Sequence, residues 1–302
     1  MFEVRGSIFN CSTVFLRYSI VILLALGNSA IAQFTPALLQ NNSYWGDGKA
    51  EFDFYDAQIV RDGQPRACEV SMILQRELVD PKTLARIDDP KKPDALATIR
   101  MNEIFALPRG MFVEQQSLTA NWRVDLFSLV HLSLVGTDSA GNFSKRLEEK
   151  REANSVTWFF IYDTYRDGAG FDRIVPPPGG TPVFYDELPF RVRTIDFSKP
   201  KGEFEIQLGA STITPNKGTI AFKAAKVSFT VTERKIDISI QHSAGTDRFA
   251  LDGWFPFLLR EWNAADGSHL KLKNSLKADY WNYNKPGDRE RALKDPKLRH
   301  PD

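Results

Sequence analysis

The sequence predicts a mostly β protein, with one large curved antiparallel sheet in the form of an open barrel or a sandwich, and few short helices. Three observations predict this class. Apolar and polar residues alternate with a period of two along several segments, turn-forming residues lie between those segments, and helical periodicity is scarce. Many antiparallel strands with one polar face each indicate a sheet that packs on a core with one side only.

The alternation is clearest in three segments, 203–208, 227–232 and 235–241. In each of them, apolar side chains at every second position alternate with charged or hydroxyl-bearing ones, as in a half-buried strand. The segment 126–135 differs, because it is apolar apart from two serines and a histidine. We therefore expect it to be a strand that is buried on both faces.

Turn residues separate these runs. Arg61–Gln64, Asp138–Asn142 and Pro215–Gly218 each carry a glycine with polar neighbours, and we expect each to close a hairpin. Glu233–Arg234 makes a short connection between two amphipathic strands.

Only two short stretches, 80–87 and 145–153, are candidates for helices in the strand-bearing part of the chain.

Residues 168–183 are rich in glycine and proline and divide the strands into two groups of similar size. This linker could separate two small domains or connect two halves of one sheet. We favour a single mostly β domain over residues 33–283, because neither half has a complete strand pattern of its own. The segment 284–302 is charged and contains three prolines, so we expect a flexible tail there.

The N-terminal residues 1–32 have the three parts of a cleavable signal peptide. Arg5 and Arg17 precede the apolar run 18–27, and Ala30–Ala32 provides small residues for cleavage. A membrane anchor is the alternative, but a spanning helix needs about 20 apolar residues. We therefore expect export to the periplasm or the extracellular space, with no integral membrane span after cleavage.

Charge and cysteine content exclude several classes of function. The chain has 39 basic and 38 acidic residues, so no long-range field would attract nucleic acid. Cys11 lies in the signal peptide and Cys68 is then alone, which rules out an internal disulfide and a cysteine-based zinc site. No two histidines have the spacing of metal ligands, and we expect neither a metal nor a cofactor.

No catalytic residue can be selected from the sequence. Ser139 lies in a Gly-Thr-Asp-Ser-Ala-Gly stretch that lacks the glycine two residues before the serine of a nucleophile elbow, and a turn is expected there. A carboxylate pair for glycan hydrolysis remains an alternative, since such pairs form in space and leave no fixed spacing.

Aromatic residues near the ends of the predicted strands are the remaining candidates for a ligand site. On the concave face of a curved sheet they could line an apolar pocket, although plugging the core is the more common use of such rings. The candidates are Tyr44, Trp45, Trp254, Trp262 and Trp281.

Three stretches carry a resemblance to a known family. Tyr44–Glu51 (YWGDGKAE), Tyr185–Arg193 (containing DELPFRVR) and Ala278–Trp281 resemble motifs of an uncharacterised family of exported bacterial proteins. The resemblance implies export and β structure, and it implies no activity. Relatives carry a Trp-Cys-Gly element, of which the counterpart Leu134–Gly136 keeps only the glycine.

Three functions follow from these features. The leading hypothesis is a non-enzymatic exported protein that binds an apolar small molecule or lipid on its concave sheet. The alternatives are a hydrolase of envelope polymers or glycans, and a structural or partner-binding protein that uses the strand edges beside the linker.

Overall fold

The computed structural model describes residues 34–89, 91–152, 155–165, 168–175, 177, 182–211 and 220–300. The chain divides into two compact units, Met1–Gln33 and Phe34–Asp302, and only the second contains described residues. The predicted signal peptide and the predicted Pro215–Gly218 turn therefore lie outside the described residues.

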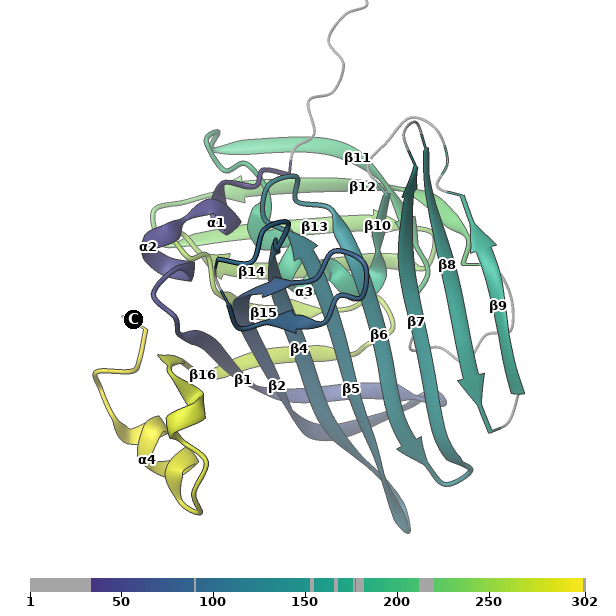
Figure 1. Cartoon of the computed structure of the whole chain (residues 1–302), viewed down its shortest axis with the longest axis horizontal. Helices are drawn as coiled ribbons and strands as arrows, with labels where there is room; N and C mark the ends of the chain where they lie inside the picture. The colour runs from purple at the N-terminus through teal and green to yellow at the C-terminus, as the bar shows by residue number, and fades with distance from the viewer. Residues whose placement is uncertain are drawn as a thin grey trace, which may run out of the picture. The chain divides into compact units, whose positions relative to one another are not determined.

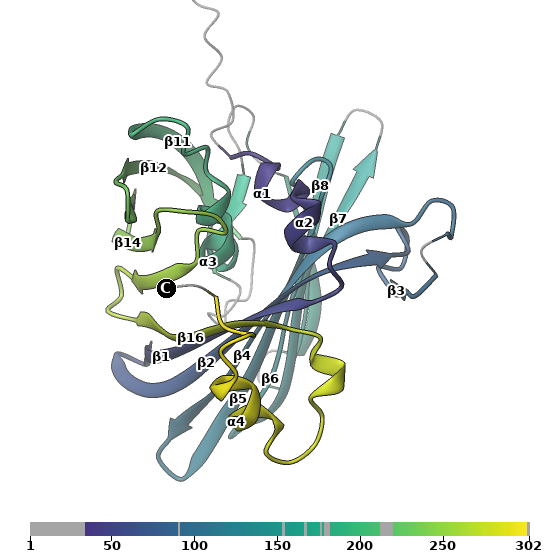
Figure 2. The same ribbon diagram turned by 90° about the vertical axis from the view of Figure 1, so that its left-hand side faces the viewer.

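The second unit is built on one large curved antiparallel sheet (Figures 1 and 2). The strands follow one another across it in the order β10-β11-β12-β13-β14-β15-β16-β1-β2-β4-β5-β6-β7-β8-β9, with β3 paired to β2. Only β10 and β11 are parallel among the described pairs. The strands are β1 (Ala50–Arg61), β2 (Gln64–Val79), β3 (Arg86–Ile87), β4 (Leu96–Arg109), β5 (Phe112–Arg123), β6 (Leu129–Asp138), β7 (Gly141–Glu152), β8 (Ser155–Thr164), β9 (Gly168–Ile174), β10 (Pro182–Phe184), β11 (Lys201–Gly209), β12 (Phe222–Val231), β13 (Lys235–His242), β14 (Gly245–Asp252), β15 (Leu259–Asn263) and β16 (His269–Ala278).

The helices of the described residues are short. They are α1 (Ala37–Gln40), α2 (Asn42–Trp45), α3 (Leu188–Arg191) and α4 (Asp288–Lys294), with 3₁₀ turns η1 (Tyr185–Glu187), η2 (Val192–Thr194) and η3 (Tyr280–Asn282). The predicted fold class, a curved antiparallel sheet with few short helices, is confirmed.

The two halves of the sheet meet where β1 pairs with β16, and the outer edges are β9 and β10. The predicted linker 168–183 therefore connects the two edges. Its first residues, Gly168–Ile174, form the edge strand β9. An edge strand needs a partner on one side only, so it tolerates the glycines that the sequence places there.

Most local predictions are confirmed. The three alternating segments lie in β11, β12 and β13. Asp62 and Gly63 connect β1 to β2 with φ angles of 53° and 71°, the pair of positive values that a type I′ hairpin turn requires. Turns at 139–140 and 233–234 close two further hairpins.

The prediction for 126–135 was wrong in two respects. The strand begins at Leu129, and it is buried on one face only: Leu132 and Leu134 are buried, whereas Val135 is 48% exposed. Because the core lies on one side of the sheet, alternate side chains of β6 face solvent even where they are apolar.

Both predicted helices were also wrong. Residues 80–87 form a turn followed by β3, and 145–152 belong to β7. Strand β7 pairs with β6 from Gly141 to Glu148 and with β8 from Phe143 to Glu152, and Leu147 is buried. Hydrogen bonding to two neighbours and burial of one face outweigh the helix propensity of a charged segment.

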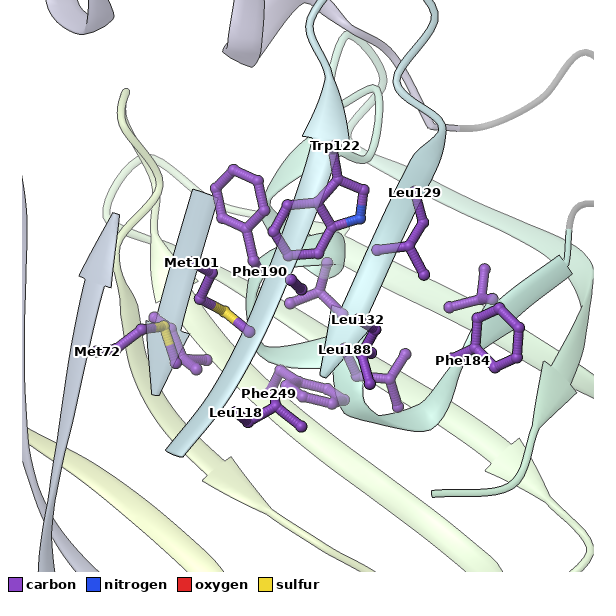
Figure 3. Close-up of a cluster of buried hydrophobic side chains, with 14 of the residues drawn as sticks. Met72, Met101, Leu118, Trp122, Leu129, Leu132, Phe184, Leu188, Phe190 and Phe249 are labelled. Atoms are coloured by element: carbon purple, nitrogen blue, oxygen red, sulfur yellow. The ribbon is translucent and has the colours of Figure 1, made fainter. Parts of the chain in front are cut away.

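The concave side of the sheet is filled by one segment, residues 184–195, which contains η1, α3 and η2 (Figures 2 and 3). Every residue from Asp186 to Ile195 is buried. Phe190 packs against Trp122 of β5 with ring centroids 4.9 Å apart, and Phe184 packs against Trp158 of β8 at 5.3 Å. Phe184, Leu188, Phe190, Val192 and Ile195 of this segment belong to the main hydrophobic core, together with residues of the sheet.

The packing around position 136 of β6 leaves no room for a side chain, so this position requires glycine. A Cβ atom at this position would lie 2.4 Å from Cζ of Phe143 and 2.5 Å from the carbonyl oxygen of Gln115. The Phe143 ring of the neighbouring strand covers the glycine, so a side chain would displace both the ring and the backbone.

The segment that we predicted as a flexible tail contains α4 and lies against the sheet through its described residues (Figure 1). Ala292 is buried in a small cluster with Phe54 and Leu276, and Arg299 forms a bridge to Leu276. A few apolar residues without a helical period are enough to hold this charged segment in place.

Candidate functional site

A cavity of about 510 Å³ lies beside the segment that fills the concave side of the sheet. Its walls come from the end of β1, from β4 and β5, from η1, and from β11, β12, β13 and β15. The volume falls within the range of roughly 300–1,000 Å³ that is usual for small-molecule sites.

The floor of the cavity is buried and its rim is exposed. Phe105, Leu118, Pro189 and Leu208 are apolar floor residues, and Ile59 contributes to one wall. At the rim the exposed residues are Ala210, Ala221, Lys223, Ser243, Ala244 and Asp266. An apolar ligand could therefore enter from the surface and displace water from a mostly apolar interior.

Two carboxyl groups reach this apolar interior. Asp186 accepts a hydrogen bond from Ser211 Oγ at 2.5 Å. Glu103 is 8% exposed, and its carboxyl group forms no hydrogen bond or ion pair with another described residue. Burial, and then the negative charge of Asp186, raise the pKa of Glu103 to about 7.

Tyr185 and Trp262 also line the cavity, and we call this part of the lining the aromatic wall. Trp262 stacks on Phe249 with ring centroids 5.7 Å apart, and the Tyr185 ring lies 6.0 Å from those of Trp262 and His242. His242 Nε2 lies 3.3 Å from the Asp247 carboxylate. Burial, and then the Asp247 charge, raise the pKa of Tyr185, which keeps its hydroxyl neutral.

We expect Glu103→Gln to stabilise the protein at alkaline pH. The folded-state pKa of about 7 lies above the ordinary value of 4.5, so ionising Glu103 destabilises the fold increasingly from pH 4.5 to 7. Above pH 7 the variant should gain up to about 3 kcal/mol over the wild type, from 1.36 kcal/mol per pKa unit. Urea unfolding at pH 4.5, 6 and 8 measures this. A gain that does not change with pH would contradict it.

The five aromatic residues that were predicted as ligand-site candidates lie in different parts of the structure. Only Trp262 lines the cavity. Trp45 is buried in the core, and its Nε1 donates to the carbonyl oxygen of Leu38 at 2.8 Å. Trp254 and Trp281 are 38% and 47% exposed, away from the cavity lining.

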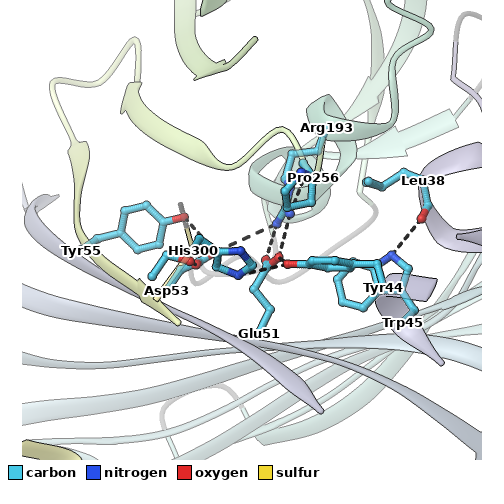
Figure 4. Close-up of polar contacts among 10 residues, drawn as sticks. Leu38, Tyr44, Trp45, Glu51, Asp53, Tyr55, Arg193, Pro256 and His300 are labelled. Atoms are coloured by element: carbon cyan, nitrogen blue, oxygen red, sulfur yellow. Dashed lines mark hydrogen bonds and ion pairs between the residues drawn. The ribbon is translucent and has the colours of Figure 1, made fainter. Parts of the chain in front are cut away.

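Tyr44, the fifth candidate, belongs to a buried polar network (Figure 4). Its hydroxyl donates to Glu51 and lies 3.1 Å from His300 Nε2. Arg193 donates to both oxygens of Glu51, at 2.6 Å and 3.0 Å, and to the carbonyl oxygen of Pro256. The Glu51 and Arg193 side chains are 0% and 1% exposed.

At the centre of this network, two carboxyl groups, those of Glu51 and Asp53, lie beside one cation, Arg193. Burial raises the pKa of Glu51, but the Arg193 charge and its hydrogen bonds outweigh burial and hold that pKa at about 2. Burial, and then the charge of Glu51, raise the pKa of Asp53 well above its usual range. Glu51 is therefore the ionised partner of Arg193, and Asp53 is the carboxyl group of the pair whose pKa is raised.

The sequence stretches 44–51 and 185–193 meet in this region. Tyr44 and Glu51 come from the first stretch and Arg193 from the second, and they are joined directly. The same second stretch supplies Tyr185, Asp186 and Pro189 to the cavity. The network therefore fixes the segment that forms one wall of the cavity.

Our reading of the sequence missed Glu103, although a signal was present. In β4 every second side chain points toward the core. Glu103 is the one charged residue among these inward positions, which are Ala97, Ile99, Met101, Glu103, Phe105 and Leu107. A charged residue on the buried face of a strand is uncommon without a partner, which makes it a candidate site residue.

Among the described residues, no three or more His, Cys, Asp or Glu side chains are grouped so as to hold a metal ion. No helix in the described part of the chain is long and apolar enough to cross a membrane. No family model, curated protein or solved structure matches this chain.

Proposed function

We propose that this chain is an exported, non-enzymatic protein that binds an apolar or amphipathic small molecule, such as a lipid, in the cavity beside residues 184–195. The observation that carries the proposal is the cavity itself. It has the volume of a ligand site, a buried apolar floor, and a few polar groups that converge in it. Export rests on the three-part pattern of residues 1–32.

The sheet provides a rigid frame for such a site. The cavity walls belong to strands with continuous ladders and to a segment that Arg193 holds in place. A cavity that is formed before the ligand arrives lowers the entropic cost of binding.

Wild-type protein should take up the neutral apolar dye Nile red, and Ala210→Trp should weaken this uptake at least about tenfold, which corresponds to 1.4 kcal/mol. Ala210 is an exposed rim residue, so an indole there obstructs the entrance. Ala37→Trp, on the exposed side of α1, is the matched control and should bind as the wild type does. Fluorescence titration, supported by native mass spectrometry, measures the affinity. No uptake by wild-type protein, or equal uptake by Ala210→Trp, would reject the proposal.

A second candidate, hydrolysis of a glycan or envelope polymer, is favoured by one observation. Glu103, with a pKa of about 7 and a neighbouring carboxyl in Asp186, has the protonation behaviour of a general acid. A panel of glycosides and esters tests it. Turnover that Glu103→Gln abolishes would support hydrolysis, and no turnover by the wild type would exclude it.

A further inference from the structure

Glu103 is a buried carboxyl group without a hydrogen-bond or ion-pair partner among the described residues. Its carboxyl group opens onto the cavity, is more than nine-tenths buried, and forms no hydrogen bond or ion pair with a described residue. A buried carboxylate normally has a cation or several donors beside it, because desolvation of an isolated charge is costly. A ligand that supplies the cation would remove this cost.

The other charged groups that line the cavity do not supply it. Arg61 lies 3.6 Å from Glu114, which also pairs with Arg109, and Arg109 in turn pairs with Asp62, so these four side chains balance one another. The other ionisable residues that line the cavity are Asp186, Tyr185, Lys223, His242 and Asp266. Lys223 is exposed at the rim and His242 faces Asp247. Among the described residues, no cation offsets the effects of burial and Asp186 on the pKa of Glu103.

The aromatic wall points to the same kind of ligand. The rings of Tyr185 and Trp262 line the cavity that holds Glu103. The faces of such rings attract ammonium groups, and carboxylate and aromatic groups together are a common environment for alkylammonium ligands.

We propose that the cavity selects an amphiphile with a cationic amine or ammonium head group, which pairs with Glu103 while its apolar chain lies on the Phe105, Leu118 and Leu208 floor. This inference rests on the proposed binding function and specifies its ligand class. Because Glu103 must be ionised to pair with the cation, binding should strengthen as the pH rises through about 7.

Three probes built on a ten-carbon chain test the inference by isothermal titration calorimetry: decyltrimethylammonium, decanol and decanoate. The quaternary ammonium does not titrate, so any pH dependence belongs to the protein. At pH 8 the cation should bind wild-type protein at least about tenfold more tightly than either other probe. At pH 6 this preference should shrink.

Glu103→Gln should lose about tenfold in affinity for the cation at pH 8 and keep its affinity for decanol. Glu205→Gln, on the exposed face of β11, is the matched control and should change neither. Histidine also titrates near neutrality, so the pH series is repeated on Glu103→Gln, where the pH dependence should vanish if Glu103 causes it.

The outcomes separate the two proposals. If decanol binds but the cation binds no more tightly, or if Glu103→Gln leaves the preference unchanged, the charge-selective site is rejected and the apolar cavity stands. If no probe binds to folded wild-type protein, both proposals fail.

Discussion

Replacing Arg193 by methionine should lower the free energy of unfolding by about 3–5 kcal/mol, the usual cost of removing one partner of a buried ion pair. The guanidinium makes two hydrogen bonds to Glu51 and two to the Pro256 carbonyl oxygen, at a position that is 1% exposed. Without it, Glu51 would be a buried carboxylate with no cation in contact. Urea unfolding followed by circular dichroism measures the loss.

Two further variants test whether the loss in Arg193→Met comes from the buried charge that remains on Glu51. Arg193→Met combined with Glu51→Gln removes both charges and should be more stable than Arg193→Met alone, because the coupling between partners is positive. Lys226→Met breaks the exposed pair with Glu203, and should change stability by less than about 1 kcal/mol. A single variant as stable as the wild type would show that the network carries little of the fold's stability.

The same pair predicts a pH dependence. The folded-state pKa of Glu51, about 2, lies below its ordinary value of 4.5. Its pairing therefore contributes fully above pH 4.5 and is lost as the pH falls toward 2. Arg193→Met should lose this contribution, so its stability should fall less than that of the wild type between pH 4.5 and 2.

Replacing Trp122 by alanine should cost about 3–5 kcal/mol, as for other fully buried large aromatic residues. Trp122 is 0% exposed, packs on Phe190, and donates from Nε1 to Glu187 at 2.6 Å. The substitution leaves a cavity between β5 and α3 and removes a donor from a buried carboxyl group. Thermal and urea unfolding measure the change.

Trp122→Phe keeps a smaller aromatic ring and removes the indole donor together with part of the ring volume, so it should cost less than Trp122→Ala. It should cost about 1–3 kcal/mol, the penalty for a buried acceptor that loses a partner. Trp281→Ala is the matched control: at 47% exposed it should stay within about 0.5 kcal/mol of the wild type. Equal losses for Trp122→Ala and Trp281→Ala would contradict the assignment of residues 184–195 as the packed interior.

Sequence reasoning predicted the elements whose cause is local. The alternation in β11, β12 and β13 and the Asp62–Gly63 turn depend on neighbouring residues only, and they were predicted with their position and type. The segments 126–135 and 145–153 were misread because burial and pairing there are decided by β5, β6 and β8. A strand with an apolar outer face has the same sequence pattern as a strand that is buried on both faces.

The candidate site was predicted only in part. Trp262 belongs to the cavity, but the other four aromatic candidates do not line it, since their type alone does not distinguish a pocket from a core. The tertiary structure decided that residues 184–195 return into the concave side of the sheet. It also brought Arg193 to Glu51, 142 positions away, and placed Glu103 in a cavity where no described residue pairs with it. The sequence alone determined a strand-rich chain with balanced charge, because alternation and composition are local properties. Pairing, burial of charge and the shape of a cavity depend on which distant residues meet, and only the folded chain sets that.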